Sequence, residues 1–166
     1  TLYICWGAQA GLYHHYGIQK QNLDDKIFGI FKNYKTTVAE PLLRGFDDIF
    51  PAPQSRHTEI KSEDIKKHPE LTILAESEQS GVLLVKSNDN RQIFMTGHLE
   101  YDTETLGVEY RRDLDQGKKI KMPENYYPNN DPWNTPISTW RSHAHLFYSN
   151  WLNYYVYQAT PFNFAD

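Results

Sequence analysis

The feature that most restricts the fold of this chain is a short apolar strand followed at once by a helix. Residues 2–5 read Leu-Tyr-Ile-Cys, an apolar run rich in β-forming side chains, and residues 8–16 have a helical pattern that Gly17 ends. Small residues at positions 7, 8, 10 and 11 allow the helix to pack closely on the strand. This order is typical of a parallel α/β sheet. We therefore expect an α/β fold with this strand in the middle of the sheet.

The start of the chain also bears on how much of a domain is present. A length of 166 residues alone would indicate one whole domain with a sizeable core. The chain begins with Thr1, however, and no residues precede the first strand to form its neighbours in the sheet. We expect residues 1–166 to be the carboxyl-terminal part of a single domain whose upstream half is absent.

Composition excludes several classes of protein. Hydrophobic residues make up 39% of the chain and aromatic residues 14%, which indicates a packed protein and not a disordered one. The mean hydropathy is −0.70, and no apolar run is long enough for a transmembrane span. A net charge of −4 disfavours binding to nucleic acid or to an anionic membrane. One cysteine cannot form an internal disulfide, so we expect a cytoplasmic location.

Beyond the first helix, segments with strand and helix patterns follow one another. The expected strands span residues 27–31, 35–38, 71–76, 81–87 and 92–96. The expected helical segments are a turn at 47–50 stopped by Pro51 and Pro53, a helix at 62–68 capped by Ser62, a helix capped by Asp102 with Leu106, Tyr110 and Leu114 at one-turn spacing, and an aromatic-rich helix at 142–158. Residues 118–136 are expected to form a long surface loop, in which the basic run 118–121 is a solvated face.

Cys5 lies where the first strand turns into the helix. Lone cysteines at the end of an apolar strand are commonly small buried hydrophobes. At this turn, however, the thiol faces the positive end of the helix, which favours the nucleophilic thiolate. The backbone N–H of Trp6 could form half of an oxyanion hole, as in a nucleophile elbow. Gly7 matches the elbow pattern, whereas Tyr3 stands where many elbows have glycine.

A cysteine nucleophile needs a base, and His98 is the candidate among the seven histidines. The other six lie in helices or in polar surface segments. His98 follows a strand end, where ligands gather in open α/β sheets, and Glu100 can reach its ring and fix the tautomer. His-x-Glu is also common in structural loops. Together with Cys5, it predicts a Cys-His-Glu triad.

Five segments of the chain form a recognisable set. They are Cys5-Trp6-Gly7-Ala8-Gln9-Ala10, Arg44-Gly45-Phe46-Asp47-Asp48, Thr96-Gly97-His98-Leu99-Glu100-Tyr101-Asp102, Asn129-Asn130-Asp131-Pro132 and Trp151-Leu152-Asn153-Tyr154-Tyr155-Val156-Tyr157-Gln158. With these segments the chain resembles, over almost its whole length, the homoserine O-acyltransferase family, the succinyl- and acetyltransferases that are related to class I glutamine amidotransferases. Leu99 stands where relatives often have proline, which should alter only the stiffness of that loop. The resemblance implies a flavodoxin-like, three-layer α/β sandwich with a long C-terminal helix.

The resemblance also implies roles for particular residues. Cys5 becomes the acyl-thioester nucleophile, His98 the proton acceptor and Glu100 its partner. Substrate-binding positions of the family fall on Lys26, Ser55 and Arg112. Considered without the family, these three are ordinary surface side chains, although a guanidinium can hold the α-carboxylate of an amino acid with two hydrogen bonds. No metal and no cofactor are implied.

The expected reaction is transfer of an acetyl or succinyl group from acyl-CoA, as co-substrate, to the hydroxyl of L-homoserine in methionine biosynthesis. The small-molecule substrates are the expected partners, together with a second copy in a homodimer. Three alternatives stay open: a serine acceptor, a class I glutamine amidotransferase, and a fragment that only mediates interactions.

Overall fold

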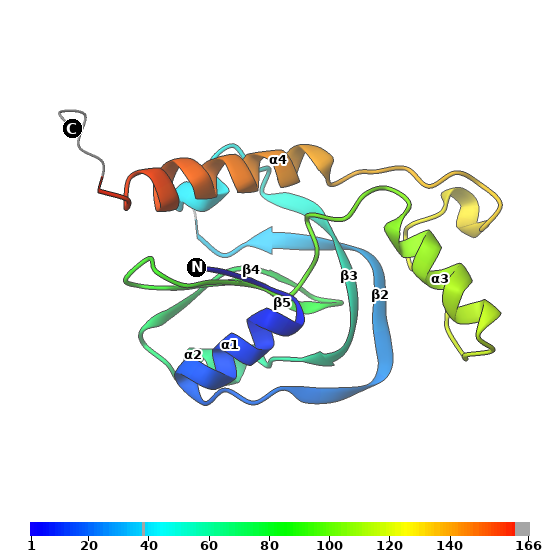
Figure 1. The fold of residues 1–166 in the computed structure, drawn as a ribbon, viewed down its shortest axis with the longest axis horizontal. Coiled ribbons are helices and arrows are strands. Elements are labelled where there is room, and N and C mark those ends of the chain that lie inside the picture. Colours follow the sequence, from blue (N-terminus) through cyan, green and yellow to red (C-terminus); the bar gives the residue numbers. More distant parts are fainter. Residues whose placement is uncertain (38, 162–166) are drawn as a thin grey trace.

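The computed structural model describes residues 1–37 and 39–161, and these residues build one curled six-stranded sheet (Figure 1). Its strand order is β1-β6-β5-β4-β2-β3. The strands are β1 (Leu2–Ile4), β2 (Gln21–Lys35), β3 (Ile49–Glu59), β4 (Leu71–Ser77), β5 (Gly81–Ser87) and β6 (Ile93–Met95). Within this sheet β1 and β6 pair in parallel, and the other neighbours are antiparallel.

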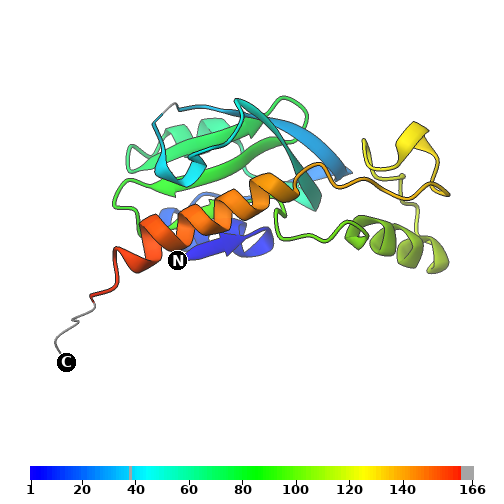
Figure 2. The same ribbon diagram turned by 90° about the horizontal axis from the view of Figure 1, so that it is seen from above.

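Helices cover the two faces of this sheet and make three layers, which confirms the expected α/β sandwich (Figures 1 and 2). On one face α1 (Trp6–Tyr16) and α2 (Ser62–Lys66) enclose a core with β4, β5 and β6. The opposite face carries the larger core, beneath α4 (Arg141–Asn150) and its continuation, a π-helix at Trp151–Tyr157. Beside the curled ends of β2 and β3 lies α3 (Thr105–Asp115). None of the described helices combines the length and apolarity needed to cross a membrane.

The first strand and helix pack as closely as the small residues predicted. A Cβ added at Gly11 would come within 2.9 Å of Phe94 and 3.2 Å of Tyr3, so α1 needs glycine there. At Gly7 the same atom would meet nothing within 4 Å, so this glycine is not required for packing. Within the described residues β1 is an edge strand, and its three residues are only half buried. Its expected place in the middle of a complete sheet stays a prediction.

The segment before α2 differs most from expectation. Strands were expected at residues 27–31 and 35–38, but residues 21–35 form the single long strand β2, bent by a bulge. Val38, the last residue of the second expected strand, lies outside the described residues. The helical turn expected at 47–50 is also wrong. Pro51 and Pro53 lie inside β3. They are tolerated because β3 is an edge strand, where a missing N–H leaves no ladder bond unmade.

Both predicted side-chain caps are wrong. Lys61 is the N-cap residue of α2 instead of Ser62, and Glu104 is the N-cap residue of α3 instead of Asp102. Neither Lys61 nor Glu104 makes a side-chain cap hydrogen bond. Along α3, Leu106 is buried, whereas Leu114 is 45% exposed. The loop at 118–136 contains a short 3-10 turn, Pro128–Asn130, and another such turn, Pro41–Leu43, precedes β3.

Candidate active site

Cys5 sits in a sharp turn between β1 and α1. Its backbone has φ 49° and ψ −113°, a left-handed conformation that side chains other than glycine rarely adopt. Hydrogen bonds on both sides hold it there: the Cys5 N–H donates to Met95 O at 2.7 Å, and the Cys5 carbonyl accepts from the Gln9 N–H at 3.1 Å. A strained turn of this kind presents the thiol at the helix end, as in a nucleophile elbow.

Trp6 is the first residue of α1 and follows the nucleophile directly. N–H groups in the first turn of a helix have no partner within the helix, so the Trp6 N–H is available to a ligand. Its indole is 70% exposed and takes no part in the core. The backbone of Trp6 therefore has the position that an oxyanion donor requires.

His98 lies three residues after the end of β6, which is the strand that pairs in parallel with β1. Its N–H donates to Pro53 O at 2.9 Å, which ties the loop to β3. The ring stacks on Tyr101, with centroids 4.1 Å apart. His98 Nδ1 lies 2.6 Å from Glu100 Oε1, and Cys5 lies close enough to the ring to affect its pKa. Since Glu100 occupies Nδ1, Nε2 is the ring nitrogen left for the thiol, and the structure places the three predicted residues in one neighbourhood.

The surroundings of His98 favour its charged form. Burial by itself lowers the pKa of His98, but hydrogen bonds and negative charge from Cys5 and Glu100 outweigh it and raise the pKa from 6.5 to about 9. Burial, and then the charges of Glu109 and Cys5, raise the pKa of Tyr101, so this stacking partner keeps its proton. At neutral pH the imidazole is therefore a cation.

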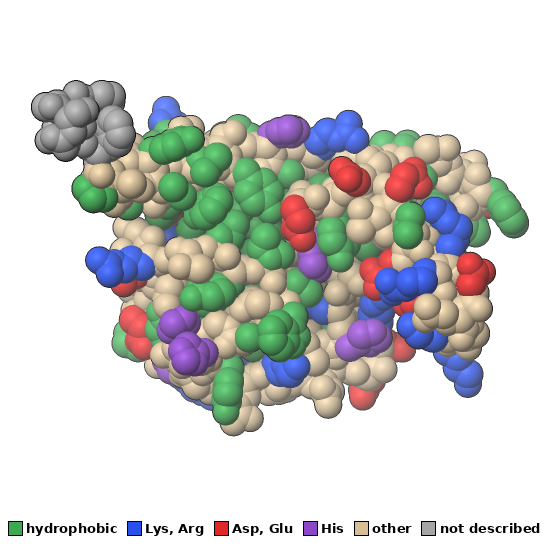
Figure 3. All heavy atoms as spheres, in the orientation of Figure 1, with side chains coloured by type: hydrophobic (Ala, Val, Ile, Leu, Met, Phe, Trp, Pro, Cys, Tyr) green, Lys and Arg blue, Asp and Glu red, His purple; other side chains and the backbone are tan. Residues whose placement is uncertain are grey.

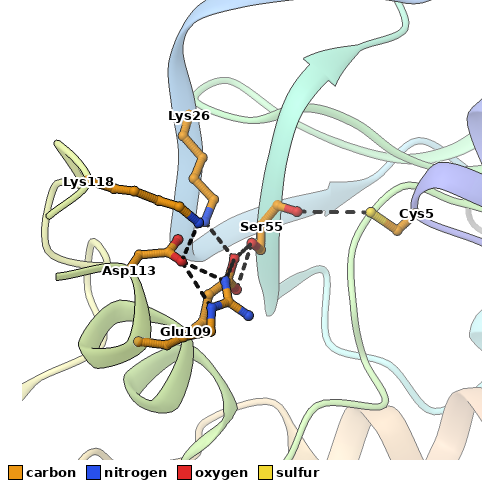
Figure 4. A network of polar contacts seen from close by, with 7 residues as sticks. Cys5, Lys26, Ser55, Glu109, Asp113 and Lys118 are labelled. Carbon is orange, nitrogen blue, oxygen red and sulfur yellow. Dashed lines mark hydrogen bonds and ion pairs between the residues drawn. The ribbon is translucent and has the colours of Figure 1, made fainter. Parts of the chain in front are cut away.

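Lys26, Ser55 and Arg112 come from β2, β3 and α3 and meet at one carboxylate, Glu109 (Figure 4). The distances to Glu109 are 2.7 Å from Lys26 Nζ, 3.0 and 2.9 Å from Ser55 Oγ, and 3.8 Å from Arg112 Nη2. Ser55 also connects this group to the nucleophile, because its carbonyl oxygen lies 4.0 Å from Cys5 Sγ. We call these four residues the polar cluster.

Glu109 was missed from the sequence. Its spacing of three residues from Arg112 places both side chains on one face of α3, and this was the signal that could have found it. Asp113 holds Arg112 as well, at 3.0 Å from Nε and 2.8 Å from Nη2. The hydrogen bond to Asp113 is the main cause that raises the pKa of Arg112. The polar cluster thus offers two cations and one anion within reach of the thiol.

Comparison with known structures fits this arrangement of fold and site. A glutamine amidotransferase from Thermotoga maritima superimposes with a TM-score of 0.56 at 18% identity, covering 90% of this chain and 56% of that one. A glutamine amidotransferase from Methylobacillus flagellatus gives a TM-score of 0.58 at 14% identity, covering 91% and 61%. The chain therefore shares its fold with these two glutamine amidotransferases.

Sequence comparison defines the family. The profile described as "Homoserine O-succinyltransferase" matches residues 1–162, and the chain belongs to this family. A homoserine O-acetyltransferase of Geobacillus sp. (strain WCH70) is 62% identical over 162 residues, and one of Clostridium acetobutylicum is 59% identical over 162 residues. Each alignment covers 98% of this chain and 54% of the relative. The chain therefore spans about half the length of the curated relatives it matches.

Proposed function

We propose that this chain carries the nucleophile, the base and the acceptor site of an enzyme that transfers an acyl group from acyl-CoA to the hydroxyl of L-homoserine. The observation that supports this most is the position of the triad Cys5, His98 and Glu100 directly beside the polar cluster. Membership of the family supports the choice of substrates and the place in methionine biosynthesis. The family resemblance also supports a cytoplasmic homodimer.

The first half-reaction forms a thioester on Cys5. The thiolate attacks the carbonyl carbon of acyl-CoA, and the Trp6 N–H donates to the oxygen that gains negative charge. When the intermediate collapses, the bond to the CoA sulfur breaks, and His98 Nε2 gives its proton to the leaving thiolate. Glu100 holds Nδ1 and so keeps Nε2 directed at the sulfur.

The second half-reaction passes the acyl group to the acceptor. His98, now neutral, takes the proton from the acceptor hydroxyl, whose oxygen attacks the thioester carbonyl. The Cys5 thiolate leaves, and the enzyme returns to its starting state. Glu100 stabilises the imidazolium that forms at this step. The same N–H of Trp6 serves both half-reactions.

The polar cluster suits an amino-acid acceptor because it carries both charges of a zwitterion. Arg112 and Lys26 can bind an α-carboxylate, and the Glu109 carboxylate can accept hydrogen bonds from an α-ammonium group. Ser55 lies between the cluster and the thiol, so it borders the path of the acceptor side chain. The acceptor hydroxyl would then point toward Cys5.

The proposal is tested by intact-mass analysis of the complete natural protein after incubation with acetyl-CoA or succinyl-CoA. We expect one acyl adduct on Cys5, its loss on addition of homoserine, and no adduct in the Cys5→Ser variant. The donor that forms the adduct identifies the acyl group, and parallel addition of serine distinguishes the two acceptors. Release of ammonia from glutamine without an acyl adduct would instead make the protein an amidotransferase.

Absence of both an adduct and glutamine hydrolysis would support the non-catalytic alternative.

A further inference from the structure

A cavity lies beside the polar cluster, on the side away from Cys5. It has a volume of about 250 Å³ and is bordered by Phe28 of β2 and by the basic run 118–121. Lys26 belongs both to this cavity and to the polar cluster. The cavity is therefore reached from the nucleophile through Ser55 and Lys26, without crossing the core.

The charge of this cavity is opposite to that of the chain. Four lysines border it, Lys26, Lys118, Lys119 and Lys121, together with His57. Two aspartates, Asp25 and Asp113, oppose them, so lysines outnumber carboxylates by two in the lining, whereas the chain carries −4. Figure 3 shows lysine and arginine side chains gathered around α3 with acidic ones among them. A local positive lining on an acidic protein indicates a site for an anion.

The ion pairs present do not use up this positive charge. Within the part of the chain that the structure describes, Lys119 makes no ion pair. Lys121 pairs with Asp25 at 2.7 Å, but the two side chains are 75% and 73% exposed, so the pair contributes little. Phosphate groups, with more than one charge and several acceptor oxygens, can displace such partners.

Lys26 and Lys118 reach the same place from two different segments of the chain. In Figure 4 their ammonium groups converge between Glu109 and Asp113. Lys118 Nζ lies 3.0 Å from Asp113 Oδ1, and Lys26 Nζ lies 2.7 Å from Glu109 Oε1. Two cations brought together from β2 and from the loop after α3 repel each other unless anions lie between them. A ligand phosphate would add to this compensation.

We propose that this cavity binds the phosphate groups of the acyl-CoA donor. The inference rests on the proposed function, because it assigns a place to the co-substrate of that reaction. In a two-step transfer the polar cluster is free of acceptor while the donor reacts, so the pantetheine arm can pass over it from the cavity to Cys5. Phe28 and Ile120 provide apolar contacts for the arm at the cavity wall. The basic run 118–121 is thus exposed, as expected, and in this proposal it contacts the phosphate groups of the donor.

The test varies the phosphates of the donor and the charge of the cavity together. Acyl thioesters of CoA, of dephospho-CoA and of pantetheine are compared as donors for the complete natural protein and for a Lys119→Ala/Lys121→Ala variant. We expect the ratio of kcat/KM for acyl-CoA to that for acyl-pantetheine to fall about tenfold or more in the variant. A Lys32→Ala/Lys66→Ala control removes the same charge from exposed positions outside the cavity and should keep the ratio.

Binding without turnover supplies a second measurement. CoA is titrated calorimetrically into Cys5→Ser protein with and without the two cavity substitutions, and we expect them to weaken binding by a similar factor. An unchanged ratio and unchanged CoA binding would overturn the cavity proposal, and so would equal losses in the control. Equal competition by inorganic phosphate at the concentration of CoA would also overturn it, since the cavity would then bind any phosphate.

Failure of the proposed function is a separate result, because wild-type protein would then use none of the three donors, pantetheine included.

Discussion

At the scale of single residues, the site depends on two groups held in unusual states. Cys5 has a positive φ that the flanking hydrogen bonds to Met95 and Gln9 maintain. His98 has its Nδ1 held by Glu100 and its ring stacked on Tyr101. These contacts hold the base in one tautomer and one orientation before substrate arrives.

The raised pKa of His98 predicts a pH-dependent contribution to stability. The pKa is about 9 in the folded protein and 6.5 ordinarily, so the stabilisation is complete below pH 6.5 and is lost as the pH rises through 9. We expect the difference in free energy of unfolding between the wild-type protein and a His98→Asn variant to shrink across this range. Urea unfolding at several pH values measures it.

The matched control for this series is His14→Asn, since His14 is an exposed histidine on α1. A constant difference for His98→Asn from pH 6 to 10 would contradict the raised pKa of His98.

At the scale of elements, close approach of α1 to the sheet places the nucleophile. Gly11 faces the stacked rings of Tyr3 and Phe94, whose centroids are 5.0 Å apart, and Phe94 is fully buried. The prolines in β3 were expected to end a helical turn at residues 47–50. They lie within a strand instead, because β3 is at the edge of the sheet, where proline is accepted.

Two glycines of α1 allow a direct test of this packing. Gly11→Ala should lower the free energy of unfolding by about 1–3 kcal/mol, because the new methyl group overlaps rings that cannot move aside. Gly7→Ala, where a Cβ meets nothing within 4 Å, should raise it by up to about 1 kcal/mol through helix propensity. Urea unfolding of both variants measures the pair. Equal changes in the free energy of unfolding of the two variants would show that α1 does not pack closely against the sheet at Gly11.

At the scale of the whole molecule, topology assembles the site from distant segments. β1 and β6 are parallel neighbours, so Cys5 and His98 emerge at the same edge of the sheet although 93 residues separate them. The curled ends of β2 and β3 bring Lys26 and Ser55 to Glu109 on α3. Each of these elements supplies one or two side chains, and the tertiary fold brings these side chains together.

The polar cluster predicts a separation between the two half-reactions. Glu109→Gln removes the anion that Lys26 and Ser55 share and that the acceptor ammonium group would use. We expect kcat/KM for homoserine to fall about tenfold to hundredfold, since a charge-assisted hydrogen bond is lost. The rate of thioester formation on Cys5 should fall much less. Stopped-flow acylation and steady-state kinetics measure the two steps.

Glu63→Gln, at an exposed position on α2, is the control for this substitution. Equal losses in both half-reactions would contradict the assignment of Glu109 to the acceptor.

Local sequence was enough to predict the strand–turn–helix that presents Cys5, the β4–β6 segment, and the pairing of His98 with Glu100, because these depend on neighbours within a few residues. The resemblance to a family extended this to Lys26, Ser55 and Arg112. The folded chain was needed to show β1 at the edge of the described sheet, the continuity of β2, and the prolines in β3. It alone brought Glu109 to Lys26 and Ser55 and placed the basic cavity beside this cluster, because contacts across the curled sheet depend on topology and not on local pattern.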